Sequence, residues 1–300
     1  MKTRKLTAIF AFLLITATAF SQDYAFKVMA NKGSNEVKSG ETWLPLKTGA
    51  SLKASDELKL VDNAYIGLIS AEGKPLEVRE AGNHKVADLT KKIKGGSSVI
   101  NKYTDFILSS NAETKKNRLS ATGAVHRGIN AIIVHLPENQ NASILNNTAV
   151  IGWHSEIPGP YIVTISNMAS DELAKVETSE SSISIDVRDP KYKFNNPSDP
   201  FSKCLVIQVR SKADPKQTSR DYMIKAMDVK ETENMKKEMS SVVTEVTEPT
   251  ALNQVILAGF YEQHHLLIDA IAAYEEALRL APGAFTEEYD DFLVRNNMKK

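Results

Sequence analysis

The side chains that could carry out chemistry are few in this chain of 300 residues, and they do not form a known catalytic pattern. The six histidines show neither an HExxH spacing nor a cysteine–histidine cluster suited to zinc. His264 and His265 are adjacent in an expected helix, where neighbouring side chains point about 100° apart and do not chelate one metal. The other histidines are His84, His126, His135 and His154. The sequence therefore predicts no metal ligand.

Nucleophilic, phosphate-binding and acid–base motifs are missing in the same way. There is no G-x-S-x-G elbow, and KGGSS at 94–98 lacks the spacing and the following lysine of a phosphate loop. The carboxylate pairs in DVRDP (186–190) and EYDD (288–291) could serve acid–base work, but nothing marks a pocket around them, so we expect exposed charge. Cys204, the only cysteine, lies in the apolar run CLVIQV and is predicted to be a buried core residue. We predict no catalytic residue and no cofactor.

The N-terminus has the pattern of an export signal. Residues 1–5 (MKTRK) are basic, and the apolar run at 6–20 is too short to span a membrane comfortably. Small residues allow cleavage after Ser21 or after Ala19, and an uncleaved anchor is the alternative. We take residues 1–21 as a signal peptide, so the protein is expected to be exported to the periplasm or to the cell surface and medium. The oxidising compartment gives no internal disulfide with a single cysteine.

The composition excludes some partner classes. Hydrophobic residues make up 42% and charged residues 25% of the chain, as in ordinary globular proteins. The 37 basic residues balance 37 acidic ones, which argues against a nucleic-acid binder. No segment after the signal has the length and apolarity of a membrane helix, so no integral membrane segment is expected after cleavage.

Two stretches read as β-structure. Residues 22–90 contain short apolar runs such as AYIGLIS, separated by turn residues, and predict an all-β module. Residues 129–228 contain seven such runs, which match a seven-stranded β-sandwich with Trp153 as a core residue. The immunoglobulin cysteine pair is absent, so a fibronectin-like or generic sandwich is the better description. The long loop at 191–203 is a candidate contact loop.

The segment at 91–128 differs from both. Val99, Ile100, Tyr103, Phe106 and Ile107 follow helical spacing and predict an amphipathic helix. The polar stretch from 111 to 128 is expected to be a connection whose basic residues face solvent.

Residues 229–300 predict helices, and one pair matches a tetratricopeptide hairpin. The expected helices cover 229–246, 251–264, 267–281 and 286–296, with Thr250 as a cap and a break at Pro249. The small and aromatic residues of the repeat fall at matching offsets, although Gln254 replaces its tryptophan and Ala258 its glycine. The matching positions are Gln254, Leu257, Ala258, Tyr261, Ala270, Tyr274 and Pro282.

A single repeat needs a neighbour, because such arrays usually require about three repeats for stability. That neighbour is either another part of the chain or another protein. By resemblance to tetratricopeptide repeats, the residues that would face a bound partner are Leu252, Val255, Gly259 and Glu262. They lack the lysine–asparagine set that clamps a peptide carboxylate.

The first β-module resembles FecR-type periplasmic domains. The shared pattern is a tryptophan before Pro-Leu, then turn and core residues: Trp43, Pro45, Leu46, Gly49, Leu52, Asp56, Ala64 and Gly73. The resemblance implies a β-rich sensing or scaffold domain in a Gram-negative envelope. Classical members have a cytoplasmic segment and one membrane helix, whereas this chain begins with a cleavable signal. The order of signal, FecR-like module, sandwich and helical hairpin resembles exported envelope proteins of Bacteroidetes-type bacteria.

The sequence thus favours a non-catalytic exported scaffold that binds a protein partner in the bacterial cell envelope. The alternative is a ligand- or glycan-binding sensor that acts through the FecR-like domain, and an extracellular hydrolase is the third reading. The identity of the partner and the oligomeric state stay open.

Overall fold

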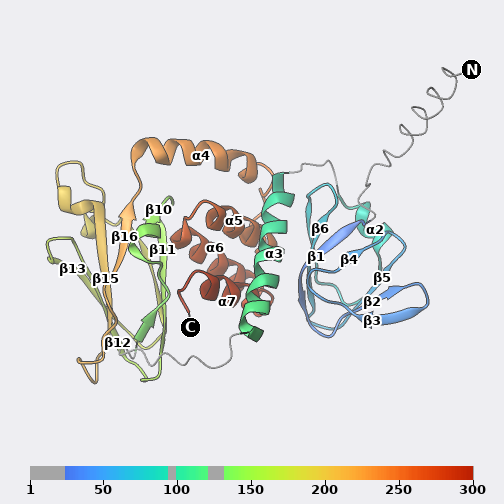
Figure 1. The fold of residues 1–300 in the computed structure, drawn as a ribbon, viewed down its shortest axis with the longest axis horizontal. Helices are drawn as coiled ribbons and strands as arrows, with labels where there is room; N and C mark the ends of the chain where they lie inside the picture. The colour runs from blue at the N-terminus through green and yellow to red at the C-terminus, as the bar shows by residue number, and fades with distance from the viewer. Residues whose placement is uncertain (1–23, 94–98, 121–131, 300) are drawn as a thin grey trace, which may run out of the picture.

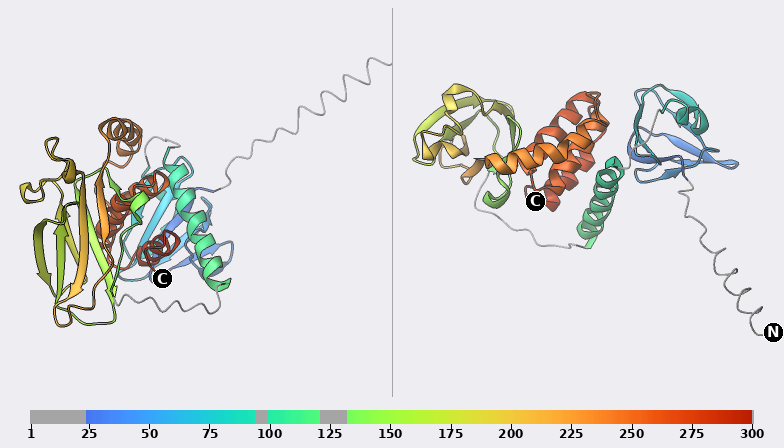
Figure 2. Two further views of the ribbon diagram at one scale, coloured as in Figure 1. Left: turned by 60° about the vertical axis from the view of Figure 1, so that its left-hand side comes forward. Right: turned by 90° about the horizontal axis from the view of Figure 1, so that it is seen from above.

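The computed structural model describes residues 24–93, 99–120 and 132–299. The predicted signal peptide at 1–21 lies outside the described residues. Several antiparallel β-sheets and a set of C-terminal helices make up the fold, as the sequence predicts. The helices occupy the centre of the molecule, with one β-rich part on either side of them (Figure 1). The view from above in Figure 2 shows the same arrangement.

The first β-rich part contains two four-stranded antiparallel sheets. One has the order β4-β1-β6-β7 and the other β3-β2-β5-β8. The strands are β1 (Phe26–Lys32), β2 (Glu36–Ser39), β3 (Thr42–Pro45), β4 (Ser51–Leu52), β5 (Glu57–Leu60), β6 (Tyr65–Ser70), β7 (Pro75–Val78) and β8 (Gly82–Lys85). Gly49 has a φ of 85°, which its lack of a side chain permits. The Asp56 carboxylate accepts a hydrogen bond from Lys53 N at 2.8 Å, as expected for a turn.

This part is not purely β-structure, although the sequence predicts an all-β module at 22–90. A short helix, α2 (Val86–Thr90), follows β8. Its two buried residues, Val86 and Leu89, pack into the core between the two sheets. Five residues are too few to show a helical period, which explains why the pattern was not visible in the sequence.

Strand β6 is buried on both faces. Ile66 and Leu68 point into the core between the two sheets, and Tyr65 and Ile69 join the hydrophobic cluster of the helices. Successive side chains of a strand point to opposite faces, so both sets are apolar only when both faces are covered. The apolar run YIGLIS is therefore explained by the position of this strand between the core of the first β-rich part and the helices.

The second β-rich part has a five-stranded and a three-stranded sheet, with orders β10-β16-β15-β12-β13 and β14-β11-β9. All seven predicted strands are present, and β10 is an additional short one. The strands are β9 (Ile132–Val134), β10 (Ser143–Ile144), β11 (Thr148–Ser155), β12 (Tyr161–Ser166), β13 (Glu172–Thr178), β14 (Ser182–Asp186), β15 (Cys204–Ser211) and β16 (Tyr222–Ala226). Trp153 is 3% exposed and meets the Tyr161 ring edge-on at 5.4 Å, so it is a core residue as expected.

Helix α3 (Val99–Ser120) is longer than predicted. Residues 111–120 were expected to be part of a polar connection, but they continue the helix. Asn111 and Thr114 are buried on this extension, and Arg118 donates to the Asp290 carbonyl oxygen at 3.2 Å. Because this stretch packs against another helix through polar side chains, its sequence shows no helical spacing of apolar residues. The remainder of the predicted connection, 121–128, lies outside the described residues.

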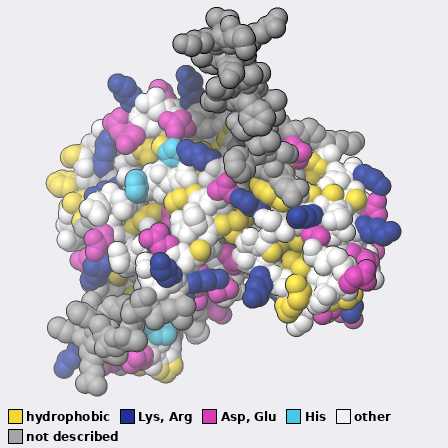
Figure 3. Space-filling view, turned by 45° about the vertical axis from the view of Figure 1, so that its right-hand side comes forward, with side chains coloured by type: hydrophobic (Ala, Val, Ile, Leu, Met, Phe, Trp, Pro, Cys, Tyr) yellow, Lys and Arg dark blue, Asp and Glu magenta, His cyan; other side chains and the backbone are white. Residues whose placement is uncertain are grey.

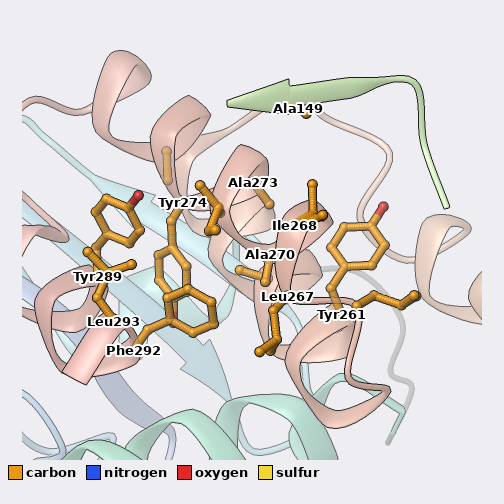
Figure 4. Close-up of a cluster of buried hydrophobic side chains, with 14 of the residues drawn as sticks. Ala149, Tyr261, Leu267, Ile268, Ala270, Ala273, Tyr274, Tyr289, Phe292 and Leu293 are labelled. Carbon is orange, nitrogen blue, oxygen red and sulfur yellow. The ribbon is translucent and has the colours of Figure 1, made fainter. Parts of the chain in front are cut away.

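The four predicted C-terminal helices are present: α4 (Val229–Val243), α5 (Ala251–Gln263), α6 (Leu267–Leu280) and α7 (Thr286–Arg295). The Thr250 side chain caps α5 by accepting from Asn253 N at 3.2 Å, as expected. Small residues such as Ala258 and Ala270, both fully buried, let α5 and α6 lie close together. Figure 4 shows Tyr274 of α6 beside Tyr289 and Phe292 of α7, with ring centroids 5.5 and 5.0 Å from Tyr274.

One hydrophobic cluster joins the three parts. It runs from β1 and β6 through the helices to the sheets of the second β-rich part. Positive and negative side chains are interspersed on the face drawn in Figure 3. Among the described residues, no helix combines the length and apolarity needed to cross a membrane.

Candidate functional site

The four residues predicted to face a partner lie inside the molecule. Leu252 and Val255 are fully buried, Gly259 is buried, and Glu262 is 6% exposed. At Gly67 of β6, a Cβ atom would lie 3.2 Å from Leu252 Cδ1, so this strand covers the start of α5. At Gly259, a Cβ atom would lie only 2.6 Å from Ile107 Cδ1 of α3. This face of the hairpin therefore contacts β6 and α3 of the same chain in this conformation.

Glu262 takes part in a buried ion pair. Its carboxylate accepts hydrogen bonds from Arg295 Nε and Nη2, both at 2.6 Å, and from Asn296 Nδ2 at 2.8 Å. Arg295 Nη1 donates to Asn111 Oδ1 at 2.7 Å. Because the charges are paired and hydrogen-bonded, they link α5, α7 and α3 at a tolerable desolvation cost. The role of Glu262 in this structure is to hold the helices together.

The opposite face of the hairpin borders an open groove of about 600 Å³. We call it the hairpin groove. Helices α5 and α6 form one side, and the outer face of β11 and β14 forms the other. Its apolar floor is lined by Val150, Leu257, Ala272 and Ala273, and its polar lining by Asn146, Thr148, Ser184, Gln254, Tyr261, Asp269, Glu275, Glu276 and Arg279. In this groove the hairpin, a sheet face and an edge strand meet around an open volume.

Asp269 joins the hairpin to the sheet in this groove. The residue is 1% exposed, and its carboxylate accepts from Leu145 N and Asn146 N at 2.8 Å each. Burial raises the pKa of Asp269 to about 6, although the two backbone amides oppose that rise. Asn146 Nδ2 also donates to the Tyr261 hydroxyl oxygen at 2.8 Å, and burial raises the pKa of Tyr261 to about 12. This polar network fixes α5 and α6 against the connection that follows β10.

The rim of the groove is acidic. Two half-buried carboxyl groups, those of Glu275 and Glu276, lie at the rim with one guanidinium, that of Arg279, whereas the Asp269 carboxyl lines the groove but is buried. Arg279 is bound to Glu276 by hydrogen bonds of 2.6 and 2.7 Å. The field in the groove therefore favours positively charged groups.

The chemically interesting residues of the sequence are not brought together. Among the described residues, no three histidine, cysteine, aspartate or glutamate side chains could hold a metal ion, and His126 lies outside them. Cys204 is buried, and burial raises the pKa of its thiol. In DVRDP, Arg188 holds the pKa of the exposed Asp186 below its usual range, and the following Lys191 does the same for the half-buried Asp189.

The expectation that EYDD is exposed is wrong for two of its residues. Glu288 is 5% exposed and Asp291 is fully buried, because the extended α3 covers this side of α7. Asp291 Oδ1 lies 3.2 Å from Arg118 Nη1. Burial raises the pKa of Glu288 to about 7. These carboxyl groups face a packed helix, not an open pocket.

Sequence reasoning did not find Asn146, Ser184 and Asp269 as groove residues. They come from a loop, an edge strand and the first turn of a helix, and only the fold places them together. The one local signal is Asp269, a carboxylate inside the apolar run LIDAIAAY. No family model matches the sequence, and no curated protein is significantly similar to it.

Proposed function

We propose that this protein is a non-catalytic exported scaffold of the bacterial cell envelope, which binds a protein partner in the hairpin groove. The observation that carries the proposal is the groove itself, with its apolar floor, acidic rim and neighbouring edge strand. In this proposal α5 and α6 act as a tetratricopeptide-like hairpin. The two β-rich parts act as a FecR-like module and an immunoglobulin- or fibronectin-like domain.

The roles of the perturbed carboxyl groups support a binding function over catalysis. Shifted pKa values often mark catalytic sites. Here Asp269 accepts hydrogen bonds from two backbone amides, and Glu288 and Asp291 are covered by α3. Each therefore has a structural explanation that leaves no reacting group aimed at an open volume.

The lining of the groove indicates the chemistry of the partner. Val150, Leu257 and Ala272 are partly exposed and offer apolar contacts, whereas the rim offers carboxylates. A protein segment that combines aliphatic side chains with lysine or arginine satisfies both. The order β14-β11-β9 leaves β14 at the edge of its sheet, so an extended segment can also gain main-chain hydrogen bonds there.

A groove-filling substitution tests this function. Ala272→Trp places a large ring in the groove, and Ala87→Trp makes the same change at an exposed position of α2. Binding of a fluorescent peptide that alternates leucine and lysine is measured by anisotropy with the full chain. We expect Ala272→Trp to weaken binding at least about tenfold, or about 1.4 kcal/mol, and Ala87→Trp to leave it unchanged.

Two further measurements make this test specific. A peptide that alternates leucine and glutamate must bind much more weakly, and added salt must weaken binding of the lysine peptide. A photocrosslinker at position 272, but not at position 87, must capture a partner in the native envelope, and that purified partner must compete with the lysine peptide. Equal binding of both peptides, or an unaffected Ala272→Trp variant, would rule out the groove as the interface.

A further inference from the structure

A second cavity lies where the first β-rich part meets the start of α5. Its volume is about 580 Å³, within the usual range of small-molecule sites. Three separate segments line it. They are β7 with the residue on either side of it (74–79), the residues that follow α2 (92–93), and the connection from α4 to α5 with the first turn of α5 (245–253). This cavity is distinct from the hairpin groove and shares no lining residue with it.

The cavity contains a buried acceptor without a partner. Asn253 is 5% exposed, and its Nδ2 donates to the Glu248 carbonyl oxygen at 2.8 Å. That bond fixes the orientation of the amide, because a flipped amide would set two oxygens against each other. Asn253 Oδ1 then has no hydrogen-bond partner among the described residues. A buried acceptor in this state costs free energy. The oxygen itself has almost no accessible surface, so a donor group of a bound molecule reaches it when the Asn253 side chain shifts toward the cavity, and the new bond would recover that cost.

A carboxylate of the chain, that of Glu77, already lies at the N-terminus of α5. Glu77 Oε1 accepts from Leu252 N at 2.9 Å and from the Tyr65 hydroxyl at 2.7 Å. Glu77 Oε2 accepts from Arg79 Nη2 at 2.8 Å. The positive end of the helix is therefore matched by a residue of the chain, and the cavity does not need an anionic ligand for that purpose.

The charges that remain are one of each sign. Lys74 is paired with Glu245, and Arg79 with Glu77. Lys92 and Glu248 also line the cavity and are exposed, and their charged groups have no partner in the described part of the chain. A molecule with an ammonium group for Glu248 and Asn253, and a carboxylate for Lys92, matches this set. Pro75, Leu76 and Ile93 add apolar wall.

We propose that this cavity binds a short zwitterionic peptide, with its free amino group at Asn253 and Glu248 and its free carboxylate at Lys92. The volume exceeds that of one amino acid and accommodates a peptide of two or three residues with an apolar side chain against Leu76 and Ile93. The site lies between the FecR-like module and the helices, so its occupant contacts both.

The test uses the dipeptide leucyl-alanine and its two blocked forms, the N-acetyl dipeptide and the C-terminal amide. Binding to the full chain is measured by calorimetry. We expect each blocked form to bind at least about tenfold more weakly than the free dipeptide, which is about 1.4 kcal/mol. Glu248→Ala is expected to remove most of the preference for the free amine, and Lys92→Ala the preference for the free carboxylate.

Matched controls separate this result from a general charge effect. Lys91→Ala and Glu233→Ala remove exposed charges of the same types outside the cavity, and both must bind like the unmodified chain. All four positions are exposed, so the variants are expected to fold, and thermal unfolding verifies this. Equal binding of the free and blocked peptides, or unchanged preferences in Lys92→Ala and Glu248→Ala, would overturn the proposal, as would the absence of binding at millimolar peptide.

Discussion

At the scale of single residues, the structure gives buried polar groups a role in joining elements. Glu262, expected to meet a partner, pairs with Arg295 instead. The sequence did not mark Asp269 as a site residue, yet its carboxylate links α6 to the connection after β10 through two hydrogen bonds. Sequence patterns show which residues are polar but not which neighbours satisfy them. This is why the predicted binding residues and the groove residues are different sets.

Asp269 is expected to make stability depend on pH. Its folded pKa is raised from 3.8 to about 6, so the folded state holds this proton where the unfolded state has lost it. The free energy of unfolding therefore falls as pH rises from about 4 to about 6, by about 3 kcal/mol for a shift of this size. Asp269→Asn cannot titrate, and its free energy of unfolding should lack this fall.

Denaturant unfolding of both proteins between pH 4 and 7 measures the difference. The substitution also loses one acceptor for a backbone amide, which lowers stability at every pH, so the slope and not the absolute value is the readout. Glu276→Gln is the control of opposite sign, because Arg279 lowers the pKa of Glu276 and its contribution is lost as pH falls. Parallel curves for Asp269→Asn and the unmodified chain would contradict the assignment.

At the scale of elements, the strands and helices follow from local patterns, and their burial follows from partners far away in sequence. The seven runs between 129 and 228 alternate well enough to be recognised. The second half of α3 could not be recognised, because Asn111 and Arg118 contact α7 through polar groups, and the buried Thr114 bonds to the backbone of α3 itself. Helix α3 thus belongs with the C-terminal helices in space and supplies the neighbour that a single hairpin needs.

The crossing of α3 and α5 depends on a glycine. In an exposed helix, Gly→Ala stabilises by about 1 kcal/mol. At Gly259, the added methyl group would lie 2.6 Å from Ile107 Cδ1 and 3.3 Å from the Tyr103 carbonyl oxygen. Overpacking costs about 1–3 kcal/mol, so we expect Gly259→Ala to destabilise the protein instead.

Chemical unfolding of a double-mutant cycle tests this expectation. Ile107→Val removes the Cδ1 atom but keeps a carbon at the Cγ1 position, 2.9 Å from the added methyl group, so Gly259→Ala should cost less, but still destabilise, in the Ile107→Val background. Gly152→Ala is the control, because its Cβ atom would meet only His135 Nδ1 at 3.5 Å, an ordinary contact. A stabilising Gly259→Ala, or a cycle without coupling, would show that α3 does not press on this position.

At the scale of the whole molecule, the helices connect the two β-rich parts into one packed body. The first part keeps a core of its own around Leu58 and Ile66, but the outer face of β6 belongs to the cluster of the helices. Domain boundaries drawn along the sequence do not show this, because 91–128 and 229–300 are separated by an entire β-rich part. Only at β6, where both faces of the strand are apolar, does the sequence pattern indicate that the first β-rich part packs against something outside its own core.

Shared burial predicts shared stability. Phe260 of α5 is fully buried and contacts Tyr103 of α3, with ring centroids 5.5 Å apart. Phe260→Ala is expected to cost about 3–5 kcal/mol. Because β6 relies on the helices for its outer face, native-state hydrogen exchange should show weaker protection in β6 as well as in α5 and α6. Protection in β2 and β5, which pack on the core of the first β-rich part, should change less.

The control is Leu58→Ala, which opens that core and should give the reverse order, with β2 and β5 affected more than α6. If β6 exchanges equally in the unmodified chain and in Phe260→Ala while α5 loses protection, the helices and the first β-rich part unfold independently.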